Sequence, residues 1–204
     1  MHANYWLSGV VGHQLKHDLD LPLVTTFHTL ARVKAEMGDS EPQERIDAEA
    51  HVVSCSDVLI ANAEAVKQHL IDLYGAPKDR VEIVAPGVDR AFFSPGSAEG
   101  ARTAIGFEGE KLVLFVGRIQ PLKGLDIAVE MLAQLEDPTV SLMIVGGASG
   151  LEGQAEVARI KGIISALDLF DRVEFVDPQP HYALSTFYRA ADVVVMPSLS
   201  LIHI

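Results

Sequence analysis

Cysteine, tryptophan and long apolar runs are all scarce in this chain of 204 residues. A single cysteine, Cys55, excludes an intrachain disulfide and predicts that no cysteine-based zinc site exists. The most apolar stretch, 193–204, holds a proline, two serines and a histidine, so it is too short and too polar to span a bilayer. Met1 is not followed by the basic start and apolar core of a signal peptide. We therefore expect a soluble cytoplasmic protein without stable membrane insertion.

Positive charge is scarce as well. The chain has 16 Lys and Arg against 28 Asp and Glu, a net charge of -12, and neither half carries a basic tail or patch. This excludes nucleic acid and anionic lipid as general partners, because neutralising their phosphates needs clustered cations. An anionic small ligand would instead need a few well-placed Arg, Lys and backbone N–H groups. The 49% apolar content also excludes a disordered chain.

From residue 112 onward, short β-branched runs alternate with amphipathic stretches. This pattern is typical of parallel strands joined by crossover helices. The expected strands are 112–116, 140–145, 172–176 and 192–196, and the expected helices are 125–135, 153–167 and 182–191. The second half is therefore predicted to be a doubly wound α/β sheet.

The first half repeats this rhythm less regularly. Expected strands are 21–27, 57–61 and 81–84, and expected helices are 9–19, 43–54 and 63–74, the last with Asn62 as its N-cap. The turn-rich stretch 93–100 predicts a linker, which gives two domains, 1–97 and 98–204. Both domains look incomplete, since no strand is expected before Tyr5 to start the first sheet and no helix after the last strand.

The segment 115–124, FVGRIQPLKG, directly follows an expected strand. Gly117 permits a close approach of backbone to ligand, and Arg118 lies at the carboxyl end of that strand. Lys123 precedes the next helix, whose N-terminus favours an anion. The two cations could hold a diphosphate from two sides, Arg as a fork and Lys as a point charge. The alternative is a solvated turn with two surface cations.

This segment resembles the G-R-x-x-x-x-K-G element of family 4 glycosyltransferases. Further matching segments follow in the order of that family: YWLSG at 5–9, HTLARVK at 28–34, PGVD at 86–89 and YRAADVVVMPS at 188–198. Within the family, the motifs are similar to those of the inositol-phosphate glycosyltransferases of the mycothiol pathway. The resemblance implies an α/β protein of GT-B architecture, with two Rossmann-like doubly wound parallel-sheet domains, both incomplete in this chain.

The resemblance also implies an activity. Such enzymes are retaining transferases that move a sugar, here N-acetylglucosamine, from a UDP-sugar to 1D-myo-inositol 3-phosphate. They need no metal or other cofactor for catalysis, because fixed cations stabilise the departing diphosphate. The partners are thus a nucleotide sugar and a phosphorylated acceptor, and the full-length protein could form a homodimer. Two alternatives remain: a family 4 transferase with another donor or acceptor, resembling sucrose-phosphate synthase or a mannosyltransferase, or a nucleotide-sugar binder without catalysis.

Carried over position by position, the family motifs assign roles on the donor side. Gly117, Arg118, Lys123 and Gln179 match donor-binding positions, and the two cations offset the charge of the leaving group. His28 matches a catalytic histidine beside the transferred sugar at the domain cleft. The alternative for His28 is an ordinary histidine that is hydrogen-bonded at the end of a strand.

The acceptor side is assigned in the same way. Tyr5, Thr29 and Arg45 match positions that contact the phosphate of inositol phosphate, and two hydroxyls with a guanidinium suit a phosphate monoester. Arg45 could equally be a surface residue paired with Glu41 or Glu49 on the same helix face.

Two family elements are missing from the chain. The glycine-rich N-terminal loop is absent, and the E-x7-E element that would hold the donor sugar and ribose is replaced by LSLIHI at 199–204. The chain is therefore expected to be a fragment that is inactive by itself.

Two weaker patterns complete the survey. His13 and His17 have a spacing that can bind a metal on a helix, but no third ligand is evident, so no metal site is predicted. The glycine-rich turn 146–150 lacks the G-x-G-x-x-G spacing of a dinucleotide loop and is expected to line the donor site instead.

Overall fold

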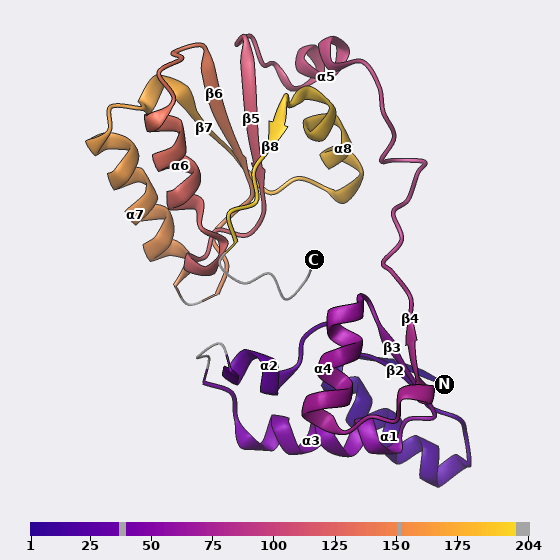
Figure 1. Ribbon diagram of the computed structural model, residues 1–204. Coiled ribbons are helices and arrows are strands. Elements are labelled where there is room, and N and C mark those ends of the chain that lie inside the picture. Colours follow the sequence, from indigo (N-terminus) through magenta and orange to yellow (C-terminus); the bar gives the residue numbers. More distant parts are fainter. Residues whose placement is uncertain (37–39, 151, 199–204) are drawn as a thin grey trace. The chain divides into compact units, whose positions relative to one another are not determined.

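The computed structural model describes residues 1–36, 40–150 and 152–198 (Figure 1). The chain divides into two compact units, Met1–Gly87 and the residues from Val88 onward, which are taken one at a time below. The division falls ten residues before the predicted domain boundary at 97/98. Residues 199–204, which replace the expected pair of glutamates, lie outside the described residues. Within the described ranges, no helix is long and apolar enough to cross a lipid bilayer.

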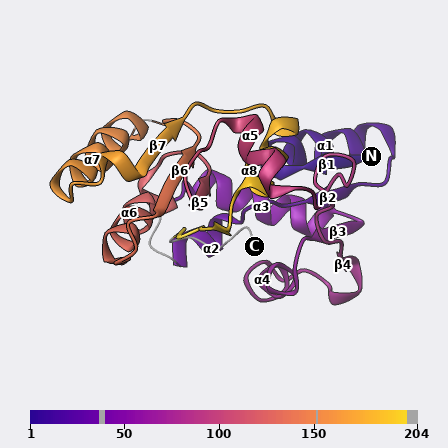
Figure 2. The ribbon, with the colours of Figure 1, turned by 90° about the horizontal axis from the view of Figure 1, so that it is seen from above.

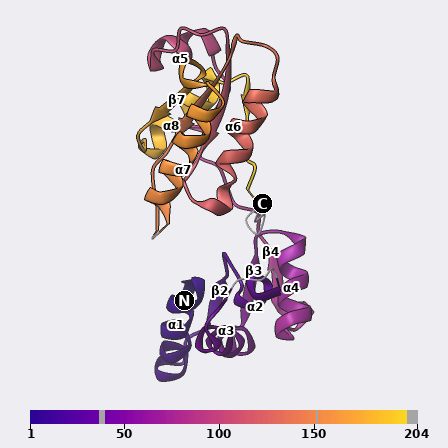
Figure 3. The same ribbon diagram turned by 90° about the vertical axis from the view of Figure 1, so that its left-hand side faces the viewer.

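The first unit contains one parallel sheet whose strands lie in chain order. They are β1 (His2–Asn4), β2 (Val24–Thr26), β3 (Val58–Ala61) and β4 (Val81–Ile83). The connecting helices are α1 (Tyr5–Leu19), α2 (Ala31–Glu36), α3 (Gln43–Cys55) and α4 (Glu64–Tyr74), and α1 runs beside α3 (Figure 3). A short 3₁₀ turn, η1 (Lys78–Arg80), leads into β4.

One face of this sheet is much more deeply buried than the other. The paired residues Ala3, Thr25, Leu59 and Val81 are at most 4% exposed, whereas all but one of their neighbours on the opposite face are half-buried or exposed. The two faces can differ in this way because side chains alternate between faces along a strand. The buried face packs against the helices. Trp6 of α1, the only tryptophan in the chain, packs against this core.

The second unit has a sheet in which the strand order reverses. Its strands are β5 (Lys111–Val116), β6 (Val140–Val145), β7 (Val173–Val176) and β8 (Val193–Val194), arranged in the order β7-β6-β5-β8 and all parallel. The helices are α5 (Ala98–Ile105), α6 (Leu125–Gln134), α7 (Gly153–Ala166) and α8 (His181–Ala190), with 3₁₀ turns η2 (Pro121–Lys123) and η3 (Phe170–Arg172). The chain leaves β5 toward β6 and later returns to the other side of β5 as β8. Ligands of open α/β sheets bind beyond the strand ends at such a reversal.

Both faces of the second sheet are covered. Val113 and Phe115 of β5 pack with α6 and α7, while Leu112 and Leu114 pack with α5 and α8. Figure 2 shows these two pairs of helices on opposite sides of the sheet. A strand buried on both faces reads as an unbroken apolar run, as LVLFV at 112–116 does. The predicted doubly wound sheet is therefore confirmed in this unit.

The strand β1 corrects one prediction for the first unit. No strand was expected before Tyr5, yet His2–Asn4 pairs in parallel with β2. A three-residue strand with two polar members has too little periodicity to be recognised in sequence. Its pairing is decided by the neighbouring strand rather than by local preference.

The prediction that Asn62 caps α4 is wrong. Ala63 occupies the cap position in extended conformation, with no side-chain cap hydrogen bond, and α4 begins at Glu64. Asn62 instead directly follows the last residue of β3. Its Oδ1 atom is buried without a hydrogen-bond partner among the described residues. The chain stays extended one residue longer than the capping pattern implied.

The stretch 93–100, expected to be a linker, is ordered against the second unit. The Phe93 ring makes an edge contact with His181 and a tilted contact with Tyr188 of α8, and the Arg189 guanidinium donates to the Ser94 carbonyl. Ser97 then caps α5, its hydroxyl accepting a hydrogen bond from the Gly100 N–H at 3.1 Å. The turn-forming residues therefore initiate a helix that the sequence analysis missed.

The loops after β5 and β6 approach each other closely at Gly117 and Gly146. Gly146 has φ of 150°, and a Cβ atom there would lie 1.9 Å from the Gly117 carbonyl oxygen. Only glycine tolerates both the backbone conformation and the contact.

We expect Gly146→Ala to lower the free energy of unfolding by at least about 3 kcal/mol, because the loops must separate and the backbone is strained. Gly162→Ala is the matched control, since Gly162 is exposed in α7 with open space around its Cβ position. Alanine there should add about 0.5–1 kcal/mol of stability. Urea unfolding followed by circular dichroism measures both; equal stabilities for the two variants would contradict the steric argument.

Candidate functional site

A pocket of about 330 Å³ lies at the carboxyl ends of β5 and β6 in the second unit. It is lined by the last residues of β5 and β6, the loops after β5, β6 and β7, and one residue of α8: Val116, Gly117, Arg118, Val145, Gly146, Gly147, Ala148, Ser149, Pro178, Gln179 and Leu184. The pocket thus brings together three of the predicted donor-binding residues, Gly117, Arg118 and Gln179. The glycine-rich turn 146–150 also contributes to its wall.

Backbone hydrogen bonds fasten the loops around this pocket. The Gly117 N–H donates to the Val145 carbonyl at 3.0 Å, and the Ile119 N–H donates to the Gly147 carbonyl at 2.8 Å. The Gln120 side chain donates to the Ser149 carbonyl at 3.2 Å. These bonds extend the pairing of β5 and β6 into their loops. The pocket wall is therefore held in place before any ligand binds.

Arg118 and Lys123 carry the positive charge near this pocket. Arg118 is exposed on the pocket wall, whereas Lys123 is half-buried in η2 and is not among the lining residues. Neither charged side chain forms an ion pair or hydrogen bond within the part of the chain that the structure describes. Their charges remain available to an anion.

The N-terminus of α6 already has an acidic neighbour of its own. Asp126 lies in the first turn and forms an ion pair with Arg159 at 2.9 Å. Burial is the strongest single influence and acts to raise the pKa of Asp126, but the hydrogen bond and charge of Arg159 together with backbone N–H groups outweigh it, so the pKa is lowered. The negative charge of Asp126 thus partly neutralises the positive end of the α6 dipole. Attraction for an external anion must come mainly from Arg118 and Lys123.

Gly124, at the N-terminus of α6, allows the chain that follows β8 to approach closely. It has φ of 63°, and a Cβ atom there would lie 2.2 Å from the Pro197 carbonyl oxygen. The K-G pair that ends the 115–124 segment therefore brings Lys123 next to the chain leaving β8, at the reversal of strand order.

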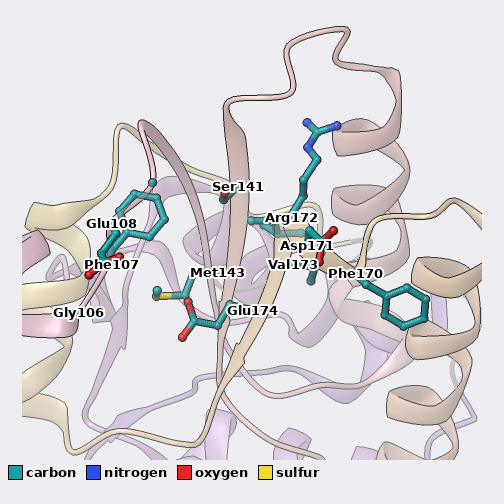
Figure 4. Close-up of a pocket in the computed structure, with 12 residues that line it drawn as sticks. Gly106, Phe107, Glu108, Ser141, Met143, Phe170, Asp171, Arg172, Val173 and Glu174 are labelled. Atoms are coloured by element: carbon teal, nitrogen blue, oxygen red, sulfur yellow. The ribbon is translucent and has the colours of Figure 1, made fainter.

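A second pocket, of about 430 Å³, lies elsewhere on the same unit (Figure 4). Phe107 and Phe170 lie on its two sides in Figure 4, and Glu108, Asp171 and Glu174 are among its lining residues. Its one cation, Arg172, donates to the backbone carbonyls of Val140 and Asp137. The remaining charge is acidic, so this pocket is unsuited to a diphosphate.

In the first unit, the three predicted acceptor residues lie together. Tyr5 begins α1 directly after β1, Thr29 follows β2, and Arg45 lies in the first turns of α3. The Arg45 Nη2 donates to Thr29 Oγ1 at 2.8 Å, and the guanidinium lies 5.3 Å from the centre of the Tyr5 ring. Tyr5 has φ of 73°, a conformation rare for a bulky residue and found preferentially at functional sites.

The alternative for Arg45, pairing with carboxylates of its own helix face, is found as well. Arg45 Nη1 lies 2.8 Å from Glu41 Oε2, and Nε lies 2.9 Å from Glu49 Oε1. Lys34 also pairs with Glu41. Arg45 is only 7% exposed and Glu49 is fully buried. The two cations and two carboxylates therefore balance, and Arg45 is a buried residue rather than a surface one.

Glu49 is the acidic centre of this cluster, and the sequence analysis noted it only as a surface partner. Its other carboxylate oxygen accepts from the Ala31 N–H at 2.8 Å and from the Tyr74 hydroxyl at 2.5 Å. Burial acts to lower the pKa of Arg45, but the hydrogen bond and charge of Glu49, together with Tyr5 and Glu41, outweigh it and the pKa is raised. Burial raises the pKa of Tyr74, so its hydroxyl stays a donor to Glu49.

His28 lies exposed just after β2, beside Thr29. It forms no hydrogen bond within the described residues, so the alternative of a hydrogen-bonded histidine at a strand end is not observed. Asn62, at the end of β3, occupies the corresponding place on the next strand. Its unpartnered Oδ1 makes it a candidate ligand-binding group that was mistaken for a helix cap in the sequence analysis.

The fold brings a third side chain of a metal-binding type to the two histidines, which the sequence did not reveal. His13, His17 and Cys55 lie close together, with one ligand atom of each within 4.8 Å of the others. Cys55 ends α3, 38 residues beyond His17, so only the packing of α1 on α3 brings them together. Burial lowers the pKa of His13, and the nearby His17 and His51 lower it further.

Comparison with known families now defines the class of protein. The family described as glycosyl transferases group 1 matches residues 97–200, and the one described as Glycosyltransferase Family 4 matches residues 1–92. The chain therefore belongs to the group 1 glycosyltransferases. Its fold is that of the GT-B glycosyltransferases, as the resemblance in sequence predicted.

Individual proteins similar to this chain point to one group within the family. A D-inositol 3-phosphate glycosyltransferase of Acidothermus cellulolyticus is 43% identical, over 98% of this chain and 47% of that protein. The enzyme of the same name from Mycolicibacterium smegmatis is also 43% identical, over 98% of this chain and 46% of its own length. The predicted likeness to this group is confirmed, and the chain spans about half the length of these relatives.

Solved structures agree with this assignment. A sucrose-phosphate synthase from Thermosynechococcus elongatus superposes with a TM-score of 0.84 at 29% identity, covering 97% of this chain and 50% of that one. Anabaena HepE in complex with UDP-glucose has a TM-score of 0.81 at 25% identity, covering 98% and 53%.

The Arg45 cluster leads to a stability prediction. Glu49→Gln should lower the free energy of unfolding by about 2–4 kcal/mol, because a buried guanidinium loses its counter-charge and an amide NH₂ faces other donors. Glu44→Gln, an exposed change on the same helix, should shift it by less than about 0.5 kcal/mol. Chemical unfolding at neutral pH compares them, and a Glu49→Gln protein as stable as Glu44→Gln would show that the ion pair contributes nothing.

Proposed function

We propose that this chain is part of a retaining glycosyltransferase that transfers a sugar from a UDP-sugar to a phosphorylated cyclitol. The donor sugar is N-acetylglucosamine and the acceptor is 1D-myo-inositol 3-phosphate. One observation carries the proposal: an unpaired Arg118 on a glycine-lined pocket at the carboxyl ends of β5 and β6, in a chain 43% identical to inositol-phosphate glycosyltransferases. A cytoplasmic location suits a chain with a single cysteine.

On the donor side, the diphosphate of UDP binds at Arg118 and Lys123. The Gly117 and Gly146 loops let the backbone approach it, and Gln179 contributes a side-chain amide from the third loop. Positive charge fixed in place before reaction stabilises the diphosphate as it departs, without a catalytic metal ion. We assign His28 to the transferred sugar because its exposed imidazole has no competing hydrogen bond among the described residues.

Transfer with retention proceeds on one face of the sugar. The bond from the anomeric carbon to the diphosphate oxygen breaks, and the bond to the acceptor oxygen forms on the same face. The acceptor hydroxyl gives its proton to an oxygen of the departing diphosphate. The chemistry is balanced without an additional base, so the protein contributes mainly orientation and charge stabilisation.

On the acceptor side, the phosphate binds beside Tyr5, Thr29 and Arg45. The tyrosine and threonine hydroxyls donate to phosphate oxygens, and Arg45 adds a guanidinium whose geometry is fixed by Glu41 and Glu49.

A second candidate is a family 4 transferase with a different acceptor. One observation favours it: the acidic partners of Arg45 and Lys34 neutralise the acceptor cluster, which weakens its attraction for any phosphate. The 29% identity to a sucrose-phosphate synthase is in line with a related sugar acceptor.

The donor assignment predicts a loss of UDP affinity in single variants. Arg118→Ala and Lys123→Ala should each weaken binding by about 1.5–3 kcal/mol, roughly 10- to 150-fold, because each removes charged hydrogen bonds to the diphosphate. Lys111→Ala is the control, since Lys111 lies at the opposite end of β5 in an exposed ion pair with Asp137. Calorimetric titration with UDP tests this; affinities that are equal in all three variants would remove the diphosphate site from this pocket.

The acceptor assignment is tested by competition between phosphates. Titration with 1D-myo-inositol 3-phosphate, myo-inositol and a hexose 6-phosphate should give the tightest binding for the first. Thr29→Val should weaken that binding by about 2- to 12-fold through the lost hydroxyl. Preference for the hexose phosphate would instead support the second candidate. A full-length form supplied with UDP-N-acetylglucosamine then shows whether the glycosylated product forms.

A further inference from the structure

Two helices of the first unit bring three metal-binding side chains to one place. His13 and His17 are four residues apart on α1, so they lie on the same face of that helix. Cys55 is the last residue of α3, which runs beside α1 (Figures 1 and 3). His17 Nε2 lies 3.1 Å from Cys55 Sγ, and the two imidazole rings are 4.8 Å apart.

The packing of α1 fixes this arrangement. A Cβ atom on Gly9 would lie 2.9 Å from Val52 Cγ1 of α3, so the helix backbone approaches α3 as closely as a glycine allows. Lys16, between the two histidines, donates to the Cys55 carbonyl at 2.9 Å and to Asp57 Oδ2 at 2.6 Å. The end of α3 is therefore tied to α1 independently of any bound ion, and Asp57 balances the charge of Lys16.

One nitrogen atom of the three side chains is buried without a hydrogen-bond partner in the described part of the chain. His13 Nδ1 is buried, and among the described residues it has no hydrogen-bond partner. Buried polar atoms nearly always have a hydrogen-bond partner, so one without a partner needs an explanation, and binding of a metal ion is one. The sulfur and two imidazoles are the donor types that zinc prefers.

We propose that His13, His17 and Cys55 bind a zinc ion, with a water molecule in the fourth position. Ligand atoms around tetrahedral zinc lie roughly 3.3–3.7 Å apart, given metal bonds of about 2.0–2.3 Å. The atoms now within 4.8 Å of one another would close by about 1 Å, which small side-chain rotations supply. The exposed side of His17 leaves the fourth position open to solvent.

The site is structural rather than catalytic. His13 and His17 lie 8 and 12 residues beyond Tyr5, about 12–18 Å along the axis of α1 at 1.5 Å per residue. The ion would clamp α1, which begins with Tyr5, to α3, which carries Arg45. Both acceptor-side elements would then be fixed to each other by the metal, which has no part in the sugar transfer proposed above.

Cobalt(II) provides the direct test, because the chain has one cysteine and a thiolate-to-cobalt charge-transfer band can arise only from Cys55. The untagged chain, stripped with chelator and reduced, should bind one equivalent of cobalt with this band and with the visible bands of a tetrahedral ion. Zinc should displace the cobalt and raise the melting temperature, since a ligand that binds only the folded state stabilises it. Absence of the charge-transfer band in the unmodified chain would overturn the proposal.

Variants locate the ion. Cys55→Ser and His17→Ala should each weaken zinc binding at least about 100-fold, more than the loss of a supporting outer residue. His69→Ala, on α4, is the control and should bind as the parent chain does. Circular dichroism without metal checks that each variant is folded. Unchanged affinity in folded Cys55→Ser or His17→Ala would place the ion elsewhere and also overturn the proposal.

Discussion

The close contact between the loops after β5 and β6 is the constraint on which the donor side depends. The Gly117 carbonyl lies where a side chain on Gly146 would be, so the two loops can meet only because Gly146 lacks a side chain. Their backbone hydrogen bonds then continue the sheet beyond its strands and fix the pocket wall. Arg118 projects from a rigid frame as a result, and a cation held in position loses little entropy on meeting a phosphate.

Arg45 differs from Arg118 and Lys123 in how its positive charge is balanced. Arg45 is buried and surrounded by the carboxylates of Glu41 and Glu49, so its charge serves the fold as much as any ligand. Arg118 and Lys123 have no carboxylate partner in the described residues. Arg45 therefore has its charge neutralised and its hydrogen bonds made within the protein. Arg118 and Lys123 remain free to bind an anionic ligand.

The sequence predicted the second unit well because its strands are buried on both faces and therefore form unmistakable apolar runs, such as 112–116. Of the residues singled out in the motif at 115–124, Gly117 and Arg118 line one pocket and Lys123 does not. What escaped prediction depends on contacts between distant segments. β1 exists only through its pairing with β2, and Cys55 meets His17 only through helix packing. Asn62 was wrongly predicted to be a helix cap because a capping residue and a polar residue at the end of a strand look alike in sequence.

The single tryptophan gives the molecule a built-in reporter. Trp6 packs against the core of the first unit, and the second unit has no tryptophan among its residues. Indole fluorescence therefore follows only the unit that holds the acceptor-side cluster, while the backbone signal follows both. The two can be observed separately in one sample without any label.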